Sequence, residues 1–373
     1  MRRLPSPLLL ATLVLAAGCS EYQAFDSTAF VREQYAERLR ASATDIDAGS
    51  LEVPFELDQA IVELVAAKLH PRRNEEDQVT ELIDFIFRDL DLQYSLTPTR
   101  NAIDTYHHRR GNCLSFVNLF VGIGRRQRLN PFYVEVRDLQ RWRHREGTVV
   151  SQGHIVAGMY VDGDLRTFDF LPYRPKSYKN FRIIDDLQAA SHYYNNLGAE
   201  ALLEGDDERA ESLLRAANAL APDFEKAINN LGVFMFRDGR VDEAIEVYRR
   251  GLELDPDNVA LLTNLASAYQ RRGESQQAAE LFERLGELRG TSPYFFVYRG
   301  ELALSQGDAG AALRFMRQAL KRDSEIPEVH IGLAKVYMSL GELDKARHHL
   351  GRALKLDATH DEARRYAALL EAR

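Results

Sequence analysis

Cysteine is nearly absent from this sequence of 373 residues, which contains only Cys19 and Cys113. Two cysteines exclude a disulfide-dense scaffold, and neither a paired CxxC nor an HExxH motif is present to indicate zinc. The adjacent histidines in His107-His108 and in His348-His349 would point to different faces of a helix. We therefore expect no metal site.

Phosphate-binding glycine motifs and long basic runs are missing as well. The sequence has no GxxxxGK[ST] loop and no GxGxxG after a strand pattern, so we expect no nucleotide or other cofactor. The net charge is −8, and short basic segments such as RHREGT and RRNEED also contain acidic residues. Because nucleic acid binding needs a basic face, we expect no nucleic acid partner.

Long apolar runs are confined to the start of the chain. Arg2 and Arg3 precede ten apolar residues at 8–17, LLLATLVLAA, and Gly18-Cys19 follows. Ten residues are too few to span about 30 Å of hydrocarbon as a helix, and the pattern is typical of a signal peptide. An ordinary secretory peptide is one interpretation of residues 1–18.

The segment LAAGC is, however, similar to the bacterial lipobox, although Ala16 stands where that motif usually has Leu. The resemblance implies that Cys19 is the first mature residue and carries a lipid that anchors the protein to a membrane. In a Gram-negative envelope, Ser20 after the cysteine favours the outer membrane, with the protein facing the periplasm.

From about residue 191 the sequence repeats every 34 residues. One glycine series and one alanine series keep this spacing: Gly205, Gly239, Gly273, Gly307 and Gly341, and Ala210, Ala244, Ala278, Ala312 and Ala346. The period and pattern are those of the tetratricopeptide repeat, a helix-turn-helix unit that stacks into a solenoid. We expect each glycine to end a first helix with positive φ, and the small residues Gly198, Gly232 and Gly300 to let paired helices approach closely.

The predicted domains follow from these patterns. Residues 1–18 are the signal peptide, 19–55 a tether and N-terminal segment, 56–187 an α+β domain, and 188–373 an all-α repeat solenoid. The five predicted units are 191–224, 225–258, 259–292, 293–326 and 327–360, followed by a capping helix at 361–373. In the α+β domain, helical spacing covers 57–69, 76–91 and 113–127, and alternating strand patterns cover 131–136, 154–161 and 165–171.

Three residues of the α+β domain form a candidate catalytic triad. Cys113 would open a helix, where free N–H groups and the helix dipole favour a thiolate and could bind an oxyanion. His154 opens a strand, and Asp169 lies in the next strand across a turn at Asp162-Gly163-Asp164, so the two should face one another. The arrangement provides a nucleophile, a base and a residue that orients the base. The alternative is that Cys113 is a small buried hydrophobic residue.

GNCLSF, GHIVAG and TFDF, in this order over roughly residues 75–173, resemble the transglutaminase-like superfamily, which has a papain-type fold. The resemblance implies Cys113 as nucleophile, His154 as base and then acid, and Asp169 as orienting residue, with acyl transfer through a thioester. Animal transglutaminases have a tryptophan upstream of the cysteine. Here the only tryptophan is Trp142, and Tyr94 or Tyr106 would have to replace it.

Two functions follow from the sequence. In the first, the chain is an envelope-anchored thiol enzyme, a peptidase or amidase with water and an acyltransferase with an amine, whose repeats recruit a protein. In the second, it is a non-catalytic assembly scaffold with a retired transglutaminase-like domain. In both, a protein or peptide binds the concave face of the repeats. Variable positions on that face are His192, Asn195, Lys226, Asn229, Thr263, Tyr294, Glu301 and Lys335.

Overall fold

The structure is a computed structural model that describes residues 27–42, 44–70, 74–145, 148–170, 178, 180–288, 293–358 and 360–371. For residues 137–145, 148–153 and 361 it describes the backbone alone. The predicted signal peptide and Cys19 lie outside the described residues.

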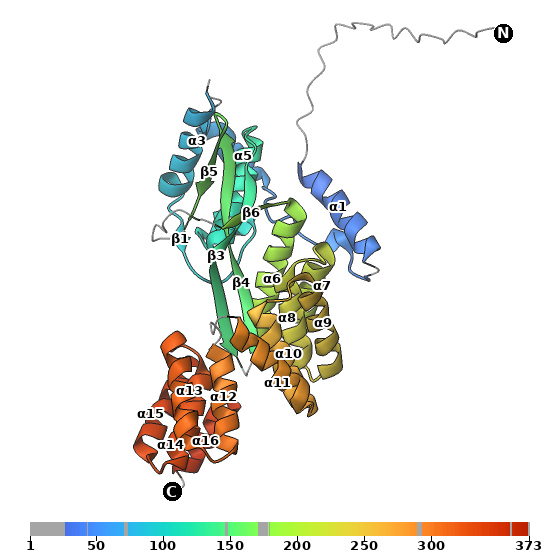
Figure 1. The fold of residues 1–373 in the computed structure, drawn as a ribbon. Helices are drawn as coiled ribbons and strands as arrows, with labels where there is room; N and C mark the ends of the chain where they lie inside the picture. The colour runs from blue at the N-terminus through green and yellow to red at the C-terminus, as the bar shows by residue number, and fades with distance from the viewer. Residues whose placement is uncertain are drawn as a thin grey trace, which may run out of the picture.

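The N-terminal half combines helices with a sheet (Figure 1). Its helices are α1 (Ser27–Ala41), α2 (Gln59–Lys68), α3 (Glu75–Asp84), α4 (Ala102–His108) and α5 (Cys113–Arg126), with the short turns η1 (Ala48–Ser50) and η2 (Phe85–Asp89). Polar side chains start several of them: Asp58, Asn74, Asn101 and Asn112 each accept a hydrogen bond from a backbone N–H in the first turn. The mixed helix and sheet composition confirms the α+β prediction for this half.

Four strands form the main sheet in the order β5-β4-β3-β6. They are β3 (Phe132–Arg145), β4 (Thr148–Val161), β5 (Asp164–Phe168) and β6 (Phe181–Ile184), and neighbouring strands are antiparallel. A separate parallel pair joins β1 (Gln93–Tyr94) to β2 (Arg110–Gly111), just before the Cys113 helix. Strands β3 and β4 are each much longer than the sequence pattern predicts, because their outer halves lack simple alternation.

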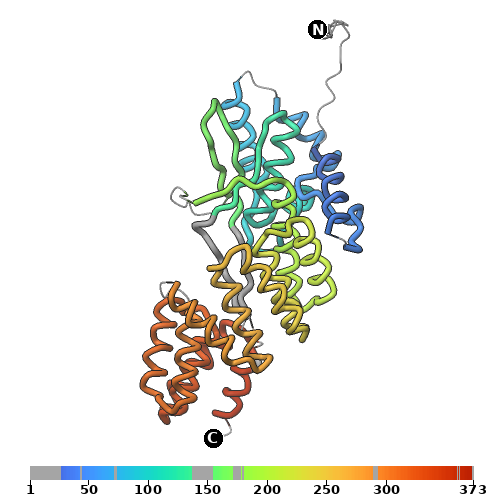
Figure 2. The backbone as a smooth tube through the Cα atoms, turned by 45° about the vertical axis from the view of Figure 1, so that its right-hand side comes forward, coloured from blue at the N-terminus to red at the C-terminus, as the bar shows by residue number. Residues whose placement is uncertain are grey.

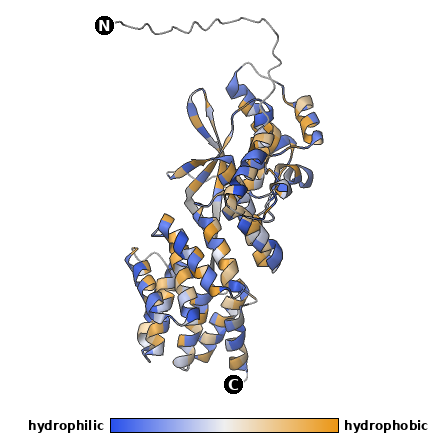
Figure 3. Cartoon of the chain, turned by 90° about the vertical axis from the view of Figure 1, so that its right-hand side faces the viewer, coloured by the Kyte–Doolittle hydropathy of each residue, from blue (hydrophilic) through white to orange (hydrophobic). Residues whose placement is uncertain are grey.

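The C-terminal half consists of helix pairs (Figures 1 and 2). The pairs are α6 (Asp186–Glu204) with α7 (Asp207–Leu220), α8 (Glu225–Arg237) with α9 (Val241–Leu254), α10 (Val259–Arg272) with α11 (Ser275–Glu287), α12 (Pro293–Ser305) with α13 (Ala309–Arg322), and α14 (Pro327–Ser339) with α15 (Leu343–Leu356). Helix α16 (Asp361–Glu371) follows. Hydrophobic residues are spread among hydrophilic ones along these helices (Figure 3).

The repeat glycines have the geometry that the sequence predicts. All five glycines of the 34-residue series have positive φ, between 75° and 85°. A Cβ on Gly198 would come within 2.6 Å of Leu214, and one on Gly300 within 2.8 Å of Met316. The predictions of a glycine helix end and of close helix pairing are both confirmed.

One hydrophobic core crosses the predicted boundary at residue 187. Tyr193, Ala217 and Phe224 of the first helices of the solenoid belong to the same buried cluster as Ile61 and Phe120 of the N-terminal half. Helix α1, within the predicted tether, buries Val31, Tyr35 and Leu39 in this core. The described part of the tether is therefore folded, and the first repeat packs as part of the N-terminal domain.

Candidate functional site

Cys113 is the first residue of α5, as the sequence predicts. The Asn112 side chain accepts a hydrogen bond from the Ser115 N–H at 3.0 Å, and the Ser115 hydroxyl lies 3.3 Å from the Asn112 N–H, which forms a capping box. Cys113 is partly exposed rather than buried.

His154 and Asp169 are in direct contact. The Nε2 atom of His154 lies 3.2 Å from Oδ2 of Asp169, and the imidazole is only 5% exposed. Their predicted strand positions need correction: Asp169 follows the last residue of β5, and the register pairs Ala157 with Phe168. Because only two residues form the turn, His154 lies two positions from the partner of Asp169, and the contact is diagonal on one face of the sheet.

The surroundings of His154 favour its charged form. Burial alone would lower the pKa of the imidazole, but hydrogen bonds and charge interactions with Asp169 and Cys113 raise the pKa to about 9. The three predicted residues are therefore brought together: His154 lies 3.2 Å from Asp169, and its charge is also stabilised by Cys113. A protonated imidazole beside a thiol at a helix start is the arrangement in which a thiolate nucleophile is stabilised.

Tyr178 is a site residue that sequence reasoning missed. Its hydroxyl lies 3.2 Å from Nε2 of His154 and donates a hydrogen bond to Oδ2 of Asp169. It therefore supports the orienting carboxylate while contacting the base. No sequence signal marks it, because it is one of 16 tyrosines and lies in a segment predicted only as a connection.

The two tyrosines that could replace the upstream tryptophan lie in different surroundings. Tyr94 pairs with Gly111 across the β1-β2 ladder, two residues before Cys113. Tyr106 lies under the guanidinium of Arg109, whose carbon is 4.1 Å from the ring centroid. The side chain of Trp142 lies outside the described residues.

A buried charge cluster joins the sheet to the solenoid. Glu135 of β3 is fully buried and forms an ion pair with Lys226 of α8, while Arg182 of β6 lies 3.1 Å from its other oxygen. Burial would raise the pKa of Glu135, but charge interactions with His192, Lys226 and Arg182 and a hydrogen bond from Lys226 lower it to about 2. Burial lowers the pKa of His192 to about 3, so Lys226 and Arg182 are the charges present at pH 7.

Most positions predicted to bind a partner are covered by the chain itself. His192, Asn195, Lys226, Asn229, Thr263 and Tyr294 are all buried. Strand β4 contacts α8 and α10, the first helices of the second and third repeats, and runs alongside them in Figure 1. The prediction of an open concave face is therefore wrong for these six positions. Glu301 and Lys335 remain partly exposed and form an ion pair at 2.8 Å.

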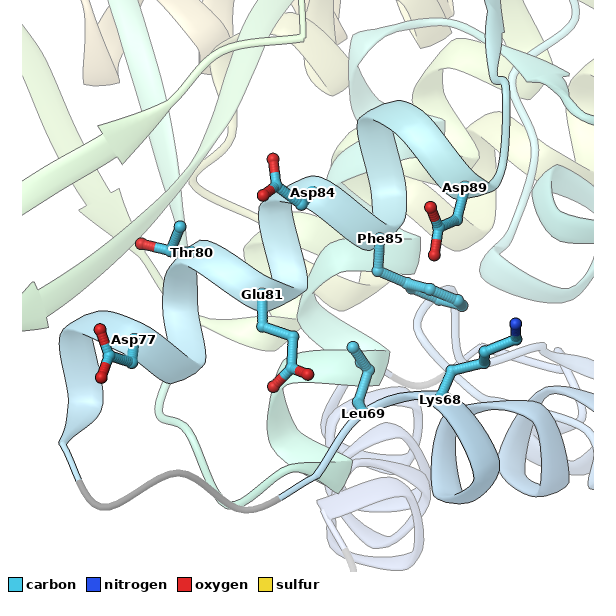
Figure 4. Close-up of a pocket in the computed structure, with 8 residues that line it drawn as sticks. All are labelled: Lys68, Leu69, Asp77, Thr80, Glu81, Asp84, Phe85 and Asp89. Carbon is cyan, nitrogen blue, oxygen red and sulfur yellow. The ribbon is translucent and has the colours of Figure 1, made fainter.

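Two pockets lie away from Cys113. The first, of about 410 Å³, has Lys68 and Leu69 on one side and α3 on the other, where Glu81 extends toward Leu69 (Figure 4). The second, of about 1080 Å³, lies among α1, α2 and α5 and includes Arg125 and Arg126. Within the described ranges no three His, Cys, Asp or Glu residues are placed to hold a metal ion.

No helix in the described part of the chain has both the length and the apolar character needed to cross a bilayer.

Three family models for tetratricopeptide repeats match the C-terminal part. They are described as TPR repeat, residues 235–273, and Tetratricopeptide repeat, residues 263–327 and 303–372. No curated protein matches the chain. This part of the protein therefore contains tetratricopeptide repeats, a type of repeat that commonly binds proteins.

Solved repeat proteins are also similar to the chain. A TPR protein of Thermus thermophilus is 22% identical, with a TM-score of 0.42, over 49% of this chain and 100% of that chain. MamA of Desulfovibrio magneticus is 16% identical, with a TM-score of 0.33, over 46% and 97% respectively. Cut9 with Hcn1, from the APC/C, is 18% identical, with a TM-score of 0.43, over 49% and 36%. These low scores add nothing to the repeat assignment, which rests on the family models.

Proposed function

We propose that this protein is a scaffold whose tetratricopeptide repeats bind another protein. The repeat matches over residues 235–372 support this proposal. The chain buries the concave positions of the first three repeats and Tyr294 of the fourth, so the partner surface lies around Glu301 of α12 and Lys335 of α14, which remain partly exposed.

A photo-crosslinking residue in place of Glu301 tests this location. We expect it to capture a partner in envelope extracts, and we expect Lys335→Glu to weaken that capture because it reverses the neighbouring charge. The same residue in place of Glu253, an exposed position on the outer helix α9, is the matched control. Equal capture at both positions, unaffected by Lys335→Glu, would contradict a partner surface on α12 and α14.

A second candidate function is thiol-dependent acyl transfer of the transglutaminase-like kind, with Cys113, His154 and Asp169 in the roles that the resemblance implies. The observation that favours it is that His154 contacts both Cys113 and Asp169 while Cys113 starts a helix. In this proposal the Cys113 thiolate attacks an amide carbonyl carbon. The C–N bond breaks as His154 gives its proton to the departing amine, which leaves a thioester and a neutral imidazole.

Water or a second amine then completes the cycle. His154 takes a proton from this acceptor as the acceptor attacks the thioester, and the thiolate leaves, so the thiolate and imidazolium are restored. Water gives hydrolysis, and an amine gives a new amide. The N–H groups at the start of α5 are suited to hold the oxyanion of each tetrahedral intermediate.

Alkylation of Cys113 tests the activated thiol without knowledge of the substrate. We expect rapid modification by iodoacetamide at pH 6, where an ordinary thiol with a pKa of about 8.5 is largely protonated. His154→Ala should slow it strongly, whereas His348→Ala on α15 should not. A Cys113 that reacts no faster than free cysteine would end the enzymatic candidate and leave the scaffold proposal standing.

We also propose that the protein is anchored in the bacterial outer membrane through a lipid on Cys19. The LAAGC segment after a short apolar run supports the proposal. Cys19→Ser should release the protein from the membrane fraction and abolish incorporation of labelled fatty acid. Continued lipid incorporation in this variant would contradict the assignment.

A further inference from the structure

We infer that Glu200, on the first repeat helix, is a positioning residue for Cys113. It acts through Thr99 and Asn112, which form a hydrogen-bonded chain from α6 to the start of α5. The inference rests on the thiol chemistry proposed above, since it explains how the nucleophile is held. It also assigns a role in the site to the solenoid.

The chain begins with a buried carboxylate. Glu200 is 7% exposed, and its oxygens accept hydrogen bonds from the Thr99 N–H at 2.9 and 3.0 Å. The Thr99 hydroxyl donates to the same carboxylate at 2.8 Å. When Glu200 is ionised, its carboxylate can only accept hydrogen bonds, and the single hydroxyl proton of Thr99 is then committed to it.

The direction of this bond sets the next one. With its proton committed, the Thr99 oxygen can only accept, and it accepts from Nδ2 of Asn112 at 2.7 Å. The Asn112 amide is thereby oriented with Oδ1 toward α5, where Oδ1 accepts from the Ser115 N–H at 3.0 Å. A longer contact of 3.5 Å from Nδ2 to the Leu96 carbonyl agrees with this orientation.

The oriented amide matters because Asn112 directly precedes Cys113. It is the N-cap of α5, and it fixes the first turn, in which Cys113 is the first residue. An amide turned the other way would present Nδ2 to the Ser115 N–H and hydroxyl, which both donate to Oδ1 at 3.0 Å. The carboxylate on the solenoid, through Thr99, therefore stabilises the same orientation of the cap that Ser115 favours.

The second side of the same loop is also held from the solenoid. Asn101 caps α4 and donates to Glu52 at 2.8 Å, and the Tyr193 hydroxyl of α6 donates to the same Glu52 oxygen at 3.1 Å. The segment from Thr99 to Asn101 is therefore hydrogen-bonded at both ends to groups that are on α6 or are bound to it: Thr99 to Glu200, and Asn101 to Glu52, which accepts from Tyr193. A displacement of α6 would be transmitted to the cap of α5.

The test compares Glu200→Gln, Thr99→Val and the double variant in the full chain. Glutamine presents an amide donor in place of one carboxylate oxygen, so the Thr99 hydroxyl is no longer forced to donate toward α6. The measurement is the pH profile of Cys113 alkylation, resolved by peptide mass spectrometry so that Cys19 does not contribute. We expect Glu200→Gln to slow alkylation by roughly five-fold at neutral pH, the loss of a typical N-cap.

The double variant separates this chain from general destabilisation. Without the Thr99 hydroxyl the direction of the bond no longer matters, so Glu200→Gln should add little to Thr99→Val. Glu204→Gln, on the exposed end of the same helix, is the matched control and should leave the profile unchanged. Additive effects of the two substitutions, or no effect of Glu200→Gln on a reactive Cys113, would overturn the inference while leaving the thiol chemistry intact.

If Cys113 is unreactive in the unaltered protein, the acyl-transfer candidate fails. The thermal unfolding midpoints of the unaltered protein, Glu200→Gln, Thr99→Val and the double variant then decide the inference. Coupled midpoints for Thr99 and Glu200 support the hydrogen-bonded chain, and additive midpoints overturn it.

Discussion

The first and last repeats share one period, one helix-pair geometry and one glycine helix end, yet their concave faces differ. In the first three repeats, these positions are buried, and Lys226 holds the buried carboxylate of Glu135. In the last two, Glu301 and Lys335 form a partly exposed ion pair, and Lys335 also pairs with Glu362 of α16. The comparison teaches that an identical repeat can serve as part of a neighbouring domain at one end and as an open surface at the other.

The largest expected effect comes from breaking the buried cluster that joins the two halves. Glu135→Ala leaves Lys226 buried without its carboxylate, and we expect it to lower the free energy of unfolding by ~3–5 kcal/mol. Chemical denaturation measures the change. The matched substitution at the open end, Glu301→Ala, should cost no more than ~1 kcal/mol, as for a surface ion pair. Equal costs at both ends would show that the two faces are energetically alike.

The pH dependence of stability should have opposite signs for His154 in the N-terminal sheet and His349 in the last repeat. The pKa of His154 is raised to about 9, so its contribution is complete below about pH 6.5 and is lost as pH rises through 9. Its size is at most roughly 3 kcal/mol. Burial lowers the pKa of His349, in the last repeat, to about 4, so that contribution is present above about pH 6.5 and is lost as pH falls toward 4.

Unfolding free energies measured from pH 4 to pH 9.5 test both signs. His154→Gln should reduce the alkaline loss and leave the acid loss unchanged. His349→Gln should reduce the acid loss without removing it, because the lowered pKa of His192, about 3, also costs stability as pH falls. If one of the two variants reduced both the acid loss and the alkaline loss of stability, the assignment of the two losses to different histidines would be wrong.

A smaller effect distinguishes glycines at the two ends. A Cβ on Gly232 in α8 would collide with the Tyr248 ring, so Gly232→Ala should destabilise the protein by ~1–3 kcal/mol through overpacking. Gly351 lies within α15, where an added Cβ would meet nothing within 4 Å, so Gly351→Ala should stabilise by ~0.5–1 kcal/mol. Thermal unfolding provides the comparison, and destabilisation by both substitutions would contradict it.

The repeats could be predicted almost completely from sequence, whereas the N-terminal domain could be predicted only in part. The 34-residue period arises because the same local requirements, a glycine at the helix end and small residues between paired helices, recur in all five repeats. The helix that starts at Cys113 was predictable for the same reason, because Asn112 and Ser115 act within one turn. The exact meeting of His154 and Asp169 was not, since it depends on a hairpin register that one residue of turn length changes.

Tyr178 and Glu200 show why the rest of the site was beyond sequence reasoning. Neither residue belongs to a motif, and each acts on a residue that only folding brings near. The buried concave positions show the same limit. They look like a variable surface in the sequence, and those on α8 and α10 are buried where β4 contacts these two helices.

The sequence by itself determined the repeating helix pairs, their glycine ends and the capped start of the Cys113 helix, because these follow from backbone sterics and hydrogen bonds within a few residues. Tertiary structure alone decided that Glu200 reaches Thr99, 101 residues away, and that Lys226 reaches Glu135, 91 residues away. Such contacts depend on how two surfaces dock, and docking depends on the packing of the whole core rather than on any local pattern of residues.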